Sequence, residues 1–302
     1  MQGGFKFIDE LTIDVISGAG GDGIVSFKRT RTRQLPDGGS GGSGGDVYLV
    51  GTTAYHGLGH LKNRRWHANR GGTGQTGNKT GESASPLDVP IPIGTRVCER
   101  HSGNLLLHID APQRYLLVAG GKAGIGNGSI ARLTNSTKGS EGTKLELLLD
   151  FRLRADVALI GIANSGKSTL LNRISNASTK IAPYPFTTQT PQLGSCDMSE
   201  HYQPPLTIVE IPSHNFSNYL KHLLHCQVIV YVVTSEQDIQ LLYDTLRAYE
   251  PSLVHKHTLI ATTDINDNRI TLAGRSLPVI DIGADIGILT RKLFQLCQSK
   301  AT

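Results

Sequence analysis

The pattern of hydrophobic and polar positions changes between the two halves of the chain. In the second half, short apolar runs typical of buried strands alternate with longer runs of helical period. The strands are predicted at residues 156–161, 206–211, 228–233, 257–262 and 277–282, and the helices at 167–175, 216–225, 239–249 and 286–298. Repeated strand-then-helix units predict an α/β fold with a mostly parallel, doubly wound sheet and helices on both faces. This architecture is typical of nucleotide-binding domains.

The first half alternates short strand-like runs with clusters of glycine. Of the 35 glycines, 29 lie in residues 1–150. They cluster at 18–23, 38–45, 71–77 and 120–128, among strands predicted at 10–16, 46–50, 89–93, 105–109 and 115–118. No strict Gly-x-y period runs through them, which argues against collagen-like chains. The clusters are either flexible linkers or extended segments packed so closely that only a residue without Cβ fits; their alternation with strands favours close packing.

Length, composition and charge narrow the class of protein. A chain of 302 residues predicts two domains. No apolar run approaches the roughly 20 residues of a membrane-spanning helix, and the first residues lack the apolar core of a secretory signal, so we expect neither membrane association nor secretion. The four cysteines (Cys98, Cys196, Cys226 and Cys297) form no C-x-x-C pair, which predicts free thiols. Residues 1–150 hold 17 basic and 13 acidic side chains, which favours a polyanionic partner.

A glycine-containing turn joins the first predicted strand of the second half to its first helix. The turn and the start of the helix comprise Gly161, Ile162, Ala163, Asn164, Ser165, Gly166, Lys167, Ser168 and Thr169, which read G-x-x-x-x-G-K-S. Gly161 and Gly166 let backbone N–H groups turn inward around phosphate oxygens, and Lys167 directs a cation to the β- and γ-phosphates. Ser168 supplies a hydroxyl to Mg²⁺. A purely structural turn is the alternative, but the strand–turn–helix setting favours nucleotide binding.

Segments on both sides of this loop resemble one protein family. GIANSGKST and, ten residues later, KIAPYPFTTQTPQLG are similar to the phosphate loop and first switch of the Obg GTPases, where GxPNAGKST and KIADYPFTTLxPxLG are characteristic. In the first half, FIDELTIDVISGAGGDGIVSFKR, GGTGQTGNKTGES and LLVAGGKAGIGN are similar in order and spacing to the Obg-specific domain. The resemblance covers about residues 5–195 and weakens beyond them.

The resemblance implies a domain organisation and a partner. Residues 1–154 are expected to form an Obg domain, a β-barrel that carries bundled glycine-rich polyproline-II segments, and residues 155–302 an Obg-type G domain. In Obg proteins the first module inserts its loops into the large ribosomal subunit during assembly. Here the corresponding loops carry the residues expected to bind rRNA, near Trp66: Lys28, Arg29, Arg31, Arg33, Lys62, Arg64, Arg65 and Arg70. Basic side chains beside an aromatic one suit phosphate contacts and base stacking; a solvated basic face is the alternative.

The resemblance also assigns residues around bound GTP or GDP. Phe186, Thr187 and Thr188 match the first switch, and Thr188 is expected to reach Mg²⁺ and the γ-phosphate. Asn164 matches the position that coordinates K⁺ in potassium-stimulated relatives. The predicted catalytic residues are Lys167, Thr188 and Glu210, and the predicted metal ligands are Ser168 and Thr188.

Two motifs depart from the family's pattern. Where Obg proteins have DxPG and a long second switch, this chain has Glu210, Pro212 and Ser213 and a shortened segment after them. Because hydrolysis needs a positioned water and a stabilised γ-phosphate, fast intrinsic turnover is not expected. The guanine-reading motif NKxD is replaced by TTDIND, in which Asp264 fits only with a one-residue deletion, while Gly283 and Ala284 keep part of the family's SA turn.

Two functions remain open at this point. One is a GTP-binding factor of large-subunit assembly with slow hydrolysis; the other is a pseudo-GTPase that binds rRNA and uses its P-loop domain as structure. The N-terminal module disfavours a third class, an ATP-dependent phosphotransferase. We interpret four histidines as solvated or hydrogen-bonded rather than as metal ligands: His101, His214, His222 and His225. The expected state is a monomer, in the bacterial cytoplasm or an organelle matrix such as the mitochondrial one.

Overall fold

The chain divides into two compact units, each described by itself below. A computed structural model describes residues 7–31, 33–129, 135–175, 191–196, 205–214, 216–262, 269–283 and 286–298. The first unit comprises Ile8–Phe151. The second unit comprises Arg152–Thr302 together with the N-terminal residues up to Phe7. Within these ranges, every helix is too short or too polar to cross a membrane.

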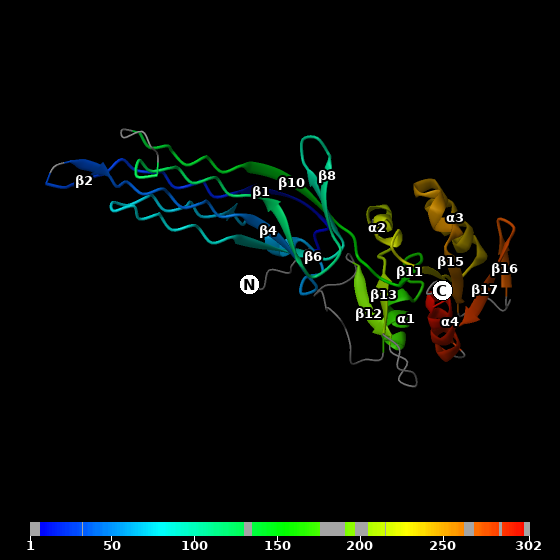
Figure 1. Cartoon of the computed structure of the whole chain (residues 1–302). Helices are drawn as coiled ribbons and strands as arrows, with labels where there is room; N and C mark the ends of the chain where they lie inside the picture. The colour runs from blue at the N-terminus through cyan, green and yellow to red at the C-terminus, as the bar shows by residue number, and fades with distance from the viewer. Residues whose placement is uncertain are drawn as a thin grey trace, which may run out of the picture. The chain divides into compact units, whose positions relative to one another are not determined.

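The first unit is built from strands and glycine-rich segments (Figure 1). Its elements are β1 (Glu10–Ile16), β2 (Phe27–Arg29), β3 (Gln34–Pro36), β4 (Val47–Thr52), a 3₁₀ turn (Gly59–Leu61), β5 (Trp66–His67), β6 (Leu87–Pro92), β7 (Thr95–Glu99), β8 (Leu105–Ile109), β9 (Arg114–Val118) and β10 (Lys144–Phe151). They form a five-stranded sheet in the order β5-β1-β10-β7-β8, a three-stranded sheet in the order β6-β4-β9, and the β2–β3 hairpin.

The strands of this unit do not close into the expected barrel. Among the described residues, β5 and β8 are the edges of the larger sheet, β6 and β9 are the edges of the smaller one, and no ladder joins the two sheets. One edge is short because β5 contributes only Trp66 and His67, which pair with the end of β1. The larger sheet is held instead by the long antiparallel pairing of β1 with β10, whose alternate side chains, including Val15, Leu147 and Leu149, are fully buried.

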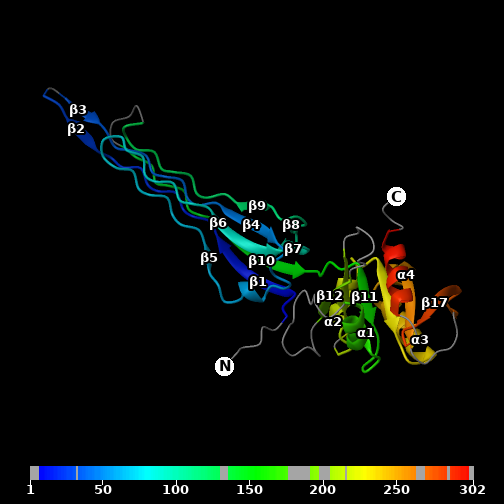
Figure 2. The same cartoon turned by 90° about the horizontal axis from the view of Figure 1, so that it is seen from below.

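The glycine-rich segments run side by side from the sheets towards the β2–β3 hairpin (Figure 2). Their backbone hydrogen bonds repeat every third residue. Gly18, Gly21 and Ile24 donate to Gly45, Gly42 and Gly39 over 2.9, 2.8 and 3.2 Å, and Gly41 and Gly44 donate to Gly124 and Gly121 over 2.8 and 2.9 Å. A Cβ on Gly41 would lie 2.0 Å from the carbonyl oxygen of Gly21. The described glycine segments are therefore closely packed and are not linkers.

A buried asparagine connects three of these segments. Asn127 is fully buried, and its Oδ1 accepts hydrogen bonds from the backbone N–H groups of Ser26 (3.2 Å) and Gly38 (2.9 Å). Its Nδ2 donates to the carbonyl of Ser26 over 3.1 Å. A buried N–H group without a hydrogen-bond partner destabilises the folded state. The Asn127 side chain therefore stabilises the packing of these three segments near the hairpin.

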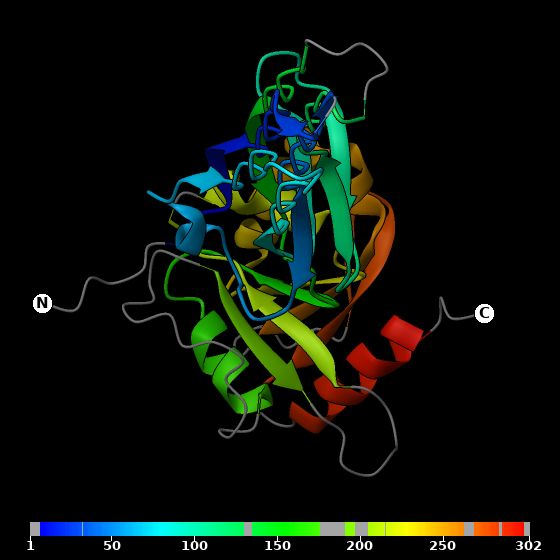
Figure 3. The same ribbon diagram turned by 60° about the vertical axis from the view of Figure 1, so that its left-hand side comes forward.

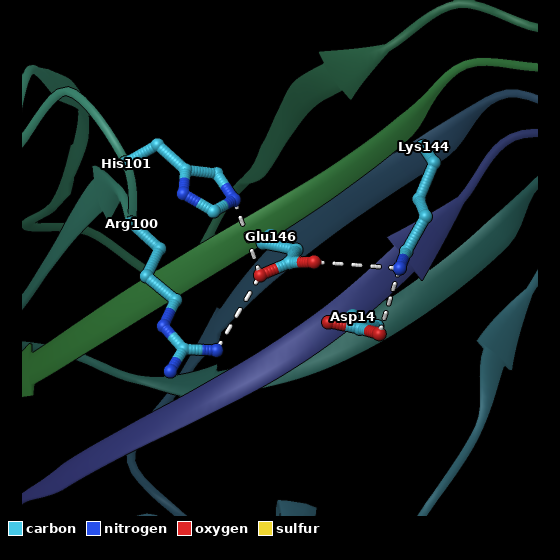
Figure 4. A network of polar contacts seen from close by, with 5 residues as sticks. All are labelled: Asp14, Arg100, His101, Lys144 and Glu146. Carbon is cyan, nitrogen blue, oxygen red and sulfur yellow. Dashed lines mark hydrogen bonds and ion pairs between the residues drawn. The ribbon is translucent and has the colours of Figure 1, made fainter.

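A group of charged side chains lies on the five-stranded sheet (Figure 4). Asp14 and Glu146 are directly opposite each other on β1 and β10, an arrangement of like charges that is unfavourable by itself. Lys144 lies between them, 3.2 Å from Asp14 Oδ2 and 3.4 Å from Glu146 Oε1. Arg100 and His101 each lie 3.4 Å from the other oxygen of Glu146. The contact with Asp14 raises the pKa of Lys144 above its ordinary value.

The second unit has the predicted α/β architecture. Its elements are β11 (Val157–Ile160), α1 (Lys167–Ile174), β12 (Gln192–Cys196), β13 (Leu206–Glu210), α2 (Phe216–Leu223), β14 (Val228–Val232), α3 (Glu236–Tyr249), a 3₁₀ turn (Pro251–His255), β15 (His257–Thr262), β16 (Arg269–Leu272), β17 (Arg275–Asp281) and α4 (Ile286–Gln298). The described strands form one sheet in the order β12-β13-β11-β14-β15-β17-β16. The five central strands are parallel, and β12 and β16 are antiparallel edges.

Helices cover both faces of this sheet. Helices α1 and α4 lie on one face, where they contact each other, and α2 and α3 lie on the opposite face (Figures 1 and 3). The fully apolar β14, which reads VIVYV, is buried along its whole length in the middle of the sheet. Apolar side chains of α1 and α4, including Leu170, Leu289 and Leu293, complete the core on their face. This packing fixes the carboxyl ends of the parallel strands, beside which the candidate site lies.

Candidate nucleotide-binding site

The loop between β11 and α1 forms the candidate site. Strand β11 ends at Ile160 and α1 begins at Lys167, so the predicted strand–turn–helix arrangement is present. Asn164 and Gly166 have positive φ angles of 62° and 88°, which bend the loop back before the helix. Gly161 is needed for close approach, because a Cβ there would lie 2.2 Å from the carbonyl oxygen of Val232. The helix therefore starts with its N-terminal N–H groups at the loop, an arrangement that attracts anions.

A cavity of about 520 Å³ opens over this loop, a volume in the range of small-ligand sites. Its lining is Ala163, Asn164, Ser165, Gly166, Lys167, Ser168, Thr169, Glu210, Pro212, Ser213 and His214. The phosphate loop and the end of β13 thus face one cavity. Gly161 and Ile162 lie at the base of the loop, where their carbonyl groups bind Lys167.

Lys167 is the buried cation of the cavity, with 5% of its surface exposed. Its Nζ donates to the carbonyl oxygens of Gly161 (3.0 Å) and Ile162 (2.6 Å). Burial lowers the pKa of Lys167, and the nearby charge of Glu210 opposes that shift. A buried ammonium group that is bonded to neutral carbonyls is well placed to attract a phosphate.

Ser168 and Glu210 form the polar wall of the cavity. Ser168 Oγ donates to Glu210 Oε1 over 2.6 Å, while Oε2 of the buried Glu210 has no hydrogen-bond partner among the described residues. Burial raises the pKa of Glu210, whereas the Ser168 hydrogen bond and the charge of Lys167 act to lower it. A hydroxyl beside a carboxylate with one uncommitted oxygen is a donor set that suits Mg²⁺. The residues present therefore fit the metal that the sequence motif implies.

Several predicted site residues cannot be compared with this geometry. Phe186, Thr187, Thr188, Asp264 and Ala284 lie outside the described residues. Gly283 is described, but its N–H donates to Asp281 Oδ1 over 2.7 Å, and it does not line the phosphate-loop cavity. Pro212 and Ser213, which the sequence placed at the second switch, line the cavity together with His214, which sequence reasoning did not place there. The available signal was its position just after the predicted strand at residues 206–211.

The described histidines, cysteines and carboxylates show no cluster that could hold a metal ion. His222 is fully buried on α2, and its Nδ1 accepts a 3.2 Å hydrogen bond from the backbone N–H of Leu153. Phe7 packs edge-on against its ring at a centroid distance of 5.9 Å. His222 is thus a hydrogen-bonded core residue.

The predicted RNA-binding side chains lie in two groups on the first unit. Lys28, Arg29, Arg31 and Arg33 are exposed on or beside the β2–β3 hairpin, and Lys62, Arg64, Arg65 and Arg70 are exposed beside β5. Arg70 is already engaged, since it donates to Gly20 O and pairs with Asp22 at 2.8 Å. Trp66 is only 8% exposed, with the Arg64 guanidinium 6.0 Å from its ring centroid. The expected stacking of an RNA base on Trp66 is therefore wrong, because the ring is buried.

The fold and the cavity define a P-loop nucleotide-binding protein with a second, glycine-rich module. Residues 8–153 match the family described as GTP1/OBG, and residues 156–261 match that of the 50S ribosome-binding GTPase. The chain is 36% identical to GTPase Obg of Syntrophus aciditrophicus, over 85% of this chain and 82% of that protein. It is 33% identical to GTPase Obg of Orientia tsutsugamushi, over 89% of this chain and 88% of that protein. The chain belongs to the Obg family of GTPases.

Among solved structures, Aquifex aeolicus Era bound to GDP·AlF₄⁻ is 18% identical, over 48% of this chain and 46% of that one. The TM-score of 0.28 is too low to support an argument about function. The likeness to the Obg relatives therefore carries the family assignment.

Proposed function

We propose that this Obg-family protein binds GTP and GDP at the phosphate loop, hydrolyses GTP slowly, and acts on the large ribosomal subunit during its assembly. The observation that carries the proposal is the shared cavity of the loop and β13, in which Lys167, Ser168 and Glu210 meet. The names of the matched family and of the relatives support the guanine nucleotide and the ribosomal partner. They give no support to the alternative of a pseudo-GTPase.

The predicted site residues have separate roles in this proposal. Loop N–H groups and Lys167 hold the β- and γ-phosphates, and Ser168 and Glu210 hold Mg²⁺, directly or through water. Bound Mg²⁺ would neutralise charge on the β- and γ-phosphate oxygens. Thr188 is proposed to reach the metal and the γ-phosphate, Asn164 to coordinate K⁺, and Asp264 with Gly283 and Ala284 to contact the guanine base.

The glycine-rich module is proposed to carry the ribosomal contact. Hydrogen bonds at every third residue agree with the three residues per turn of a polyproline-II helix, and we propose that conformation for the packed glycine segments. We propose an Obg domain of residues 1–154 and a G domain of residues 155–302. The exposed basic residues of the hairpin and of the segment beside β5 would contact rRNA phosphates.

Co-sedimentation with purified large ribosomal subunits tests this function. We expect the protein to pellet with subunits at low salt, and the double change Arg64→Glu and Arg65→Glu to weaken pelleting and to flatten its salt dependence, because phosphate contacts are lost. The matched control is Arg247→Glu with Arg291→Glu on α3 and α4, which makes the same change of charge elsewhere. Equal pelleting of the first variant and the unaltered protein at every salt concentration would contradict the proposed contact.

A further inference from the structure

We propose that Arg173 is a positioning residue of guanine recognition, which fixes the turn after β17 (Ile282 and Gly283) by a hydrogen bond from α1. The inference rests on the proposed guanine-nucleotide function and deepens it by naming a residue that acts on base selectivity. In that function Gly283 contributes to the contact with guanine. Arg173 lies between the two segments that resemble the phosphate loop and first switch of the family, and its role comes from the geometry of the second unit.

The guanidinium of Arg173 reaches the turn from the last turn of α1. Its Nη1 donates to the carbonyl oxygen of Ile282 over 3.1 Å. The same helix begins at Lys167, so the bond connects the helix of the phosphate loop to the residue directly before Gly283. A hydrogen bond from a charged donor is stronger than one between neutral groups. Arg173 therefore links the element that carries the phosphate site to the segment assigned to the base.

Two further hydrogen bonds hold the backbone of the turn. The N–H of Ile282 donates over 2.9 Å to the carbonyl oxygen of Thr262, the last residue of β15. The N–H of Gly283 donates over 2.7 Å to Oδ1 of Asp281, the last residue of β17. Both bonds come from strands of the sheet, whereas Arg173 binds the turn from α1. The arginine therefore fixes the turn relative to an element to which the two N–H bonds do not connect it.

The sequence of the turn makes this bond from outside the turn important. Gly283 stands where the family's SA turn has serine, and glycine gives the backbone more conformational freedom. The guanine-reading motif NKxD is also replaced in this chain, so we expect the turn to supply a larger share of the contact with the base. A segment that is already ordered loses less entropy when it binds a ligand. The bond from Arg173 to Ile282 therefore favours guanine binding although the arginine does not contact the nucleotide.

A purely structural role for Arg173 is the alternative, because a cation in the last turn of a helix also interacts favourably with the helix dipole. The two roles differ in the binding that they change. A structural role alters the affinity for GTP and ATP alike or alters neither, since both nucleotides bind the phosphate loop through the same phosphates. A positioning role alters the affinity for guanine nucleotides, because ATP lacks the base that the turn contacts. The preference for GTP over ATP therefore separates them.

Titrations of the full chain with fluorescent GTP, GDP and ATP analogues in Mg²⁺ and K⁺ test the inference. Arg173→Met removes the donor and keeps an unbranched side chain. We expect it to lower the GTP and GDP affinities roughly 10-fold and to leave the ATP affinity within about twofold of that of the unaltered protein. Arg173→Lys keeps a donor and should recover part of the preference for guanine. The control is Asn172→Ala, an exposed change on the same helix, which should leave all three affinities unchanged.

Either of two results would overturn the role of Arg173 while the proposed function stands. They are an unchanged preference for GTP over ATP in Arg173→Met, and an equal loss of affinity for both nucleotides in that variant. Thermal unfolding without nucleotide shows whether each variant folds. If Arg173→Met does not fold, Arg173→Lys decides, because an unchanged preference in that variant also overturns the role. Equal affinity of the unaltered protein for GTP and ATP would overturn the guanine selectivity of the proposed function and the inference together.

Discussion

Ser168 Oγ lies 2.6 Å from Glu210 Oε1, and this hydrogen bond joins the first turn of α1 to the last residue of β13. The glutamate stands where the family's pattern has aspartate, yet its longer side chain still reaches the hydroxyl expected to bind the metal. Its second oxygen is buried and has no hydrogen-bond partner among the described residues. The substitution therefore preserves a site with the oxygen donors that Mg²⁺ prefers.

Removal of the Ser168 hydroxyl should weaken the effect of Mg²⁺ on nucleotide binding. In Ser168→Ala the metal loses a donor and Glu210 loses its hydrogen bond. We expect the gain in GTP affinity on addition of Mg²⁺ to fall roughly 10- to 100-fold. Ser168→Thr keeps the hydroxyl and should retain most of the gain. Titrations with Mg²⁺ and with EDTA measure the difference, and an equal Mg²⁺ gain in all three proteins would contradict the metal assignment.

Glu210 should make the ligand-free protein less stable as pH rises. Burial raises the pKa of Glu210 in the folded protein above its ordinary value of 4.5. The folded state therefore binds the proton more tightly than the unfolded state, and stability falls as pH rises from that ordinary value through the raised one. Glu210→Gln should abolish this part of the fall.

Urea denaturation between pH 4 and 8, without nucleotide or metal, measures the dependence of stability on Glu210. The pKa of Lys167 is lowered, so its contribution runs the other way, with stability rising as pH climbs from the lowered value towards 10.5. Parallel pH profiles for Glu210→Gln and the unaltered protein would contradict the prediction for Glu210.

A methyl group in the glycine bundle should destabilise the first unit. The Cβ of Gly41→Ala would lie 2.0 Å from Gly21 O, a backbone atom held by the neighbouring segments. We expect a loss of about 3 kcal/mol, seen as a lower thermal midpoint for the first unit. Gly103→Asn is the control, because Gly103 has a φ of 69° with open space around it, a conformation that asparagine tolerates. Equal midpoints for both variants would contradict close packing of the bundle.

The Asn127 side chain should be required for the stability of the bundle. Asn127→Ala leaves the part-buried N–H group of Ser26 and the buried N–H group of Gly38 without the oxygen that they share. We expect a loss of about 3 kcal/mol in the free energy of unfolding of the first unit. Asn104→Ala, at an exposed position before β8, serves as the control. Urea titration followed by circular dichroism would show the loss, and an unchanged midpoint for Asn127→Ala would disprove it.

Sequence patterns predicted the second unit better than the first for a physical reason. Each parallel strand there is a continuous apolar run and each helix has a long amphipathic period, so local sequence identifies them, as for β14 and α3. The edge strands β12 and β16 were missed, because residues such as Gly194 and Thr271 carry no strong apolar pattern. In the first unit, the strands β1 and β8 were found with their bounds.

The arrangement of those strands depends on distant pairings that local patterns do not encode. The pairing of Ile13 with Leu147 and the hydrogen bond from Gly41 to Gly124 each join residues far apart in the chain. The same limit applies to the site. The motif identified Lys167 and Ser168, but the place of His214 beside them depends on how β13 and the start of α2 pack against the loop.

A titration with fluorescent GTP, GDP and ATP analogues in Mg²⁺ and K⁺ tests the central claim most directly, namely that this cavity binds guanine nucleotide. We expect GTP and GDP to bind more tightly than ATP. Lys167→Ala should weaken GTP binding by about 2 to 3 kcal/mol, or roughly 30- to 150-fold, while Arg247→Ala on α3 should have no effect. The absence of binding, equal affinity for GTP and ATP, or equal GTP affinity in Lys167→Ala and the unaltered protein would contradict the account.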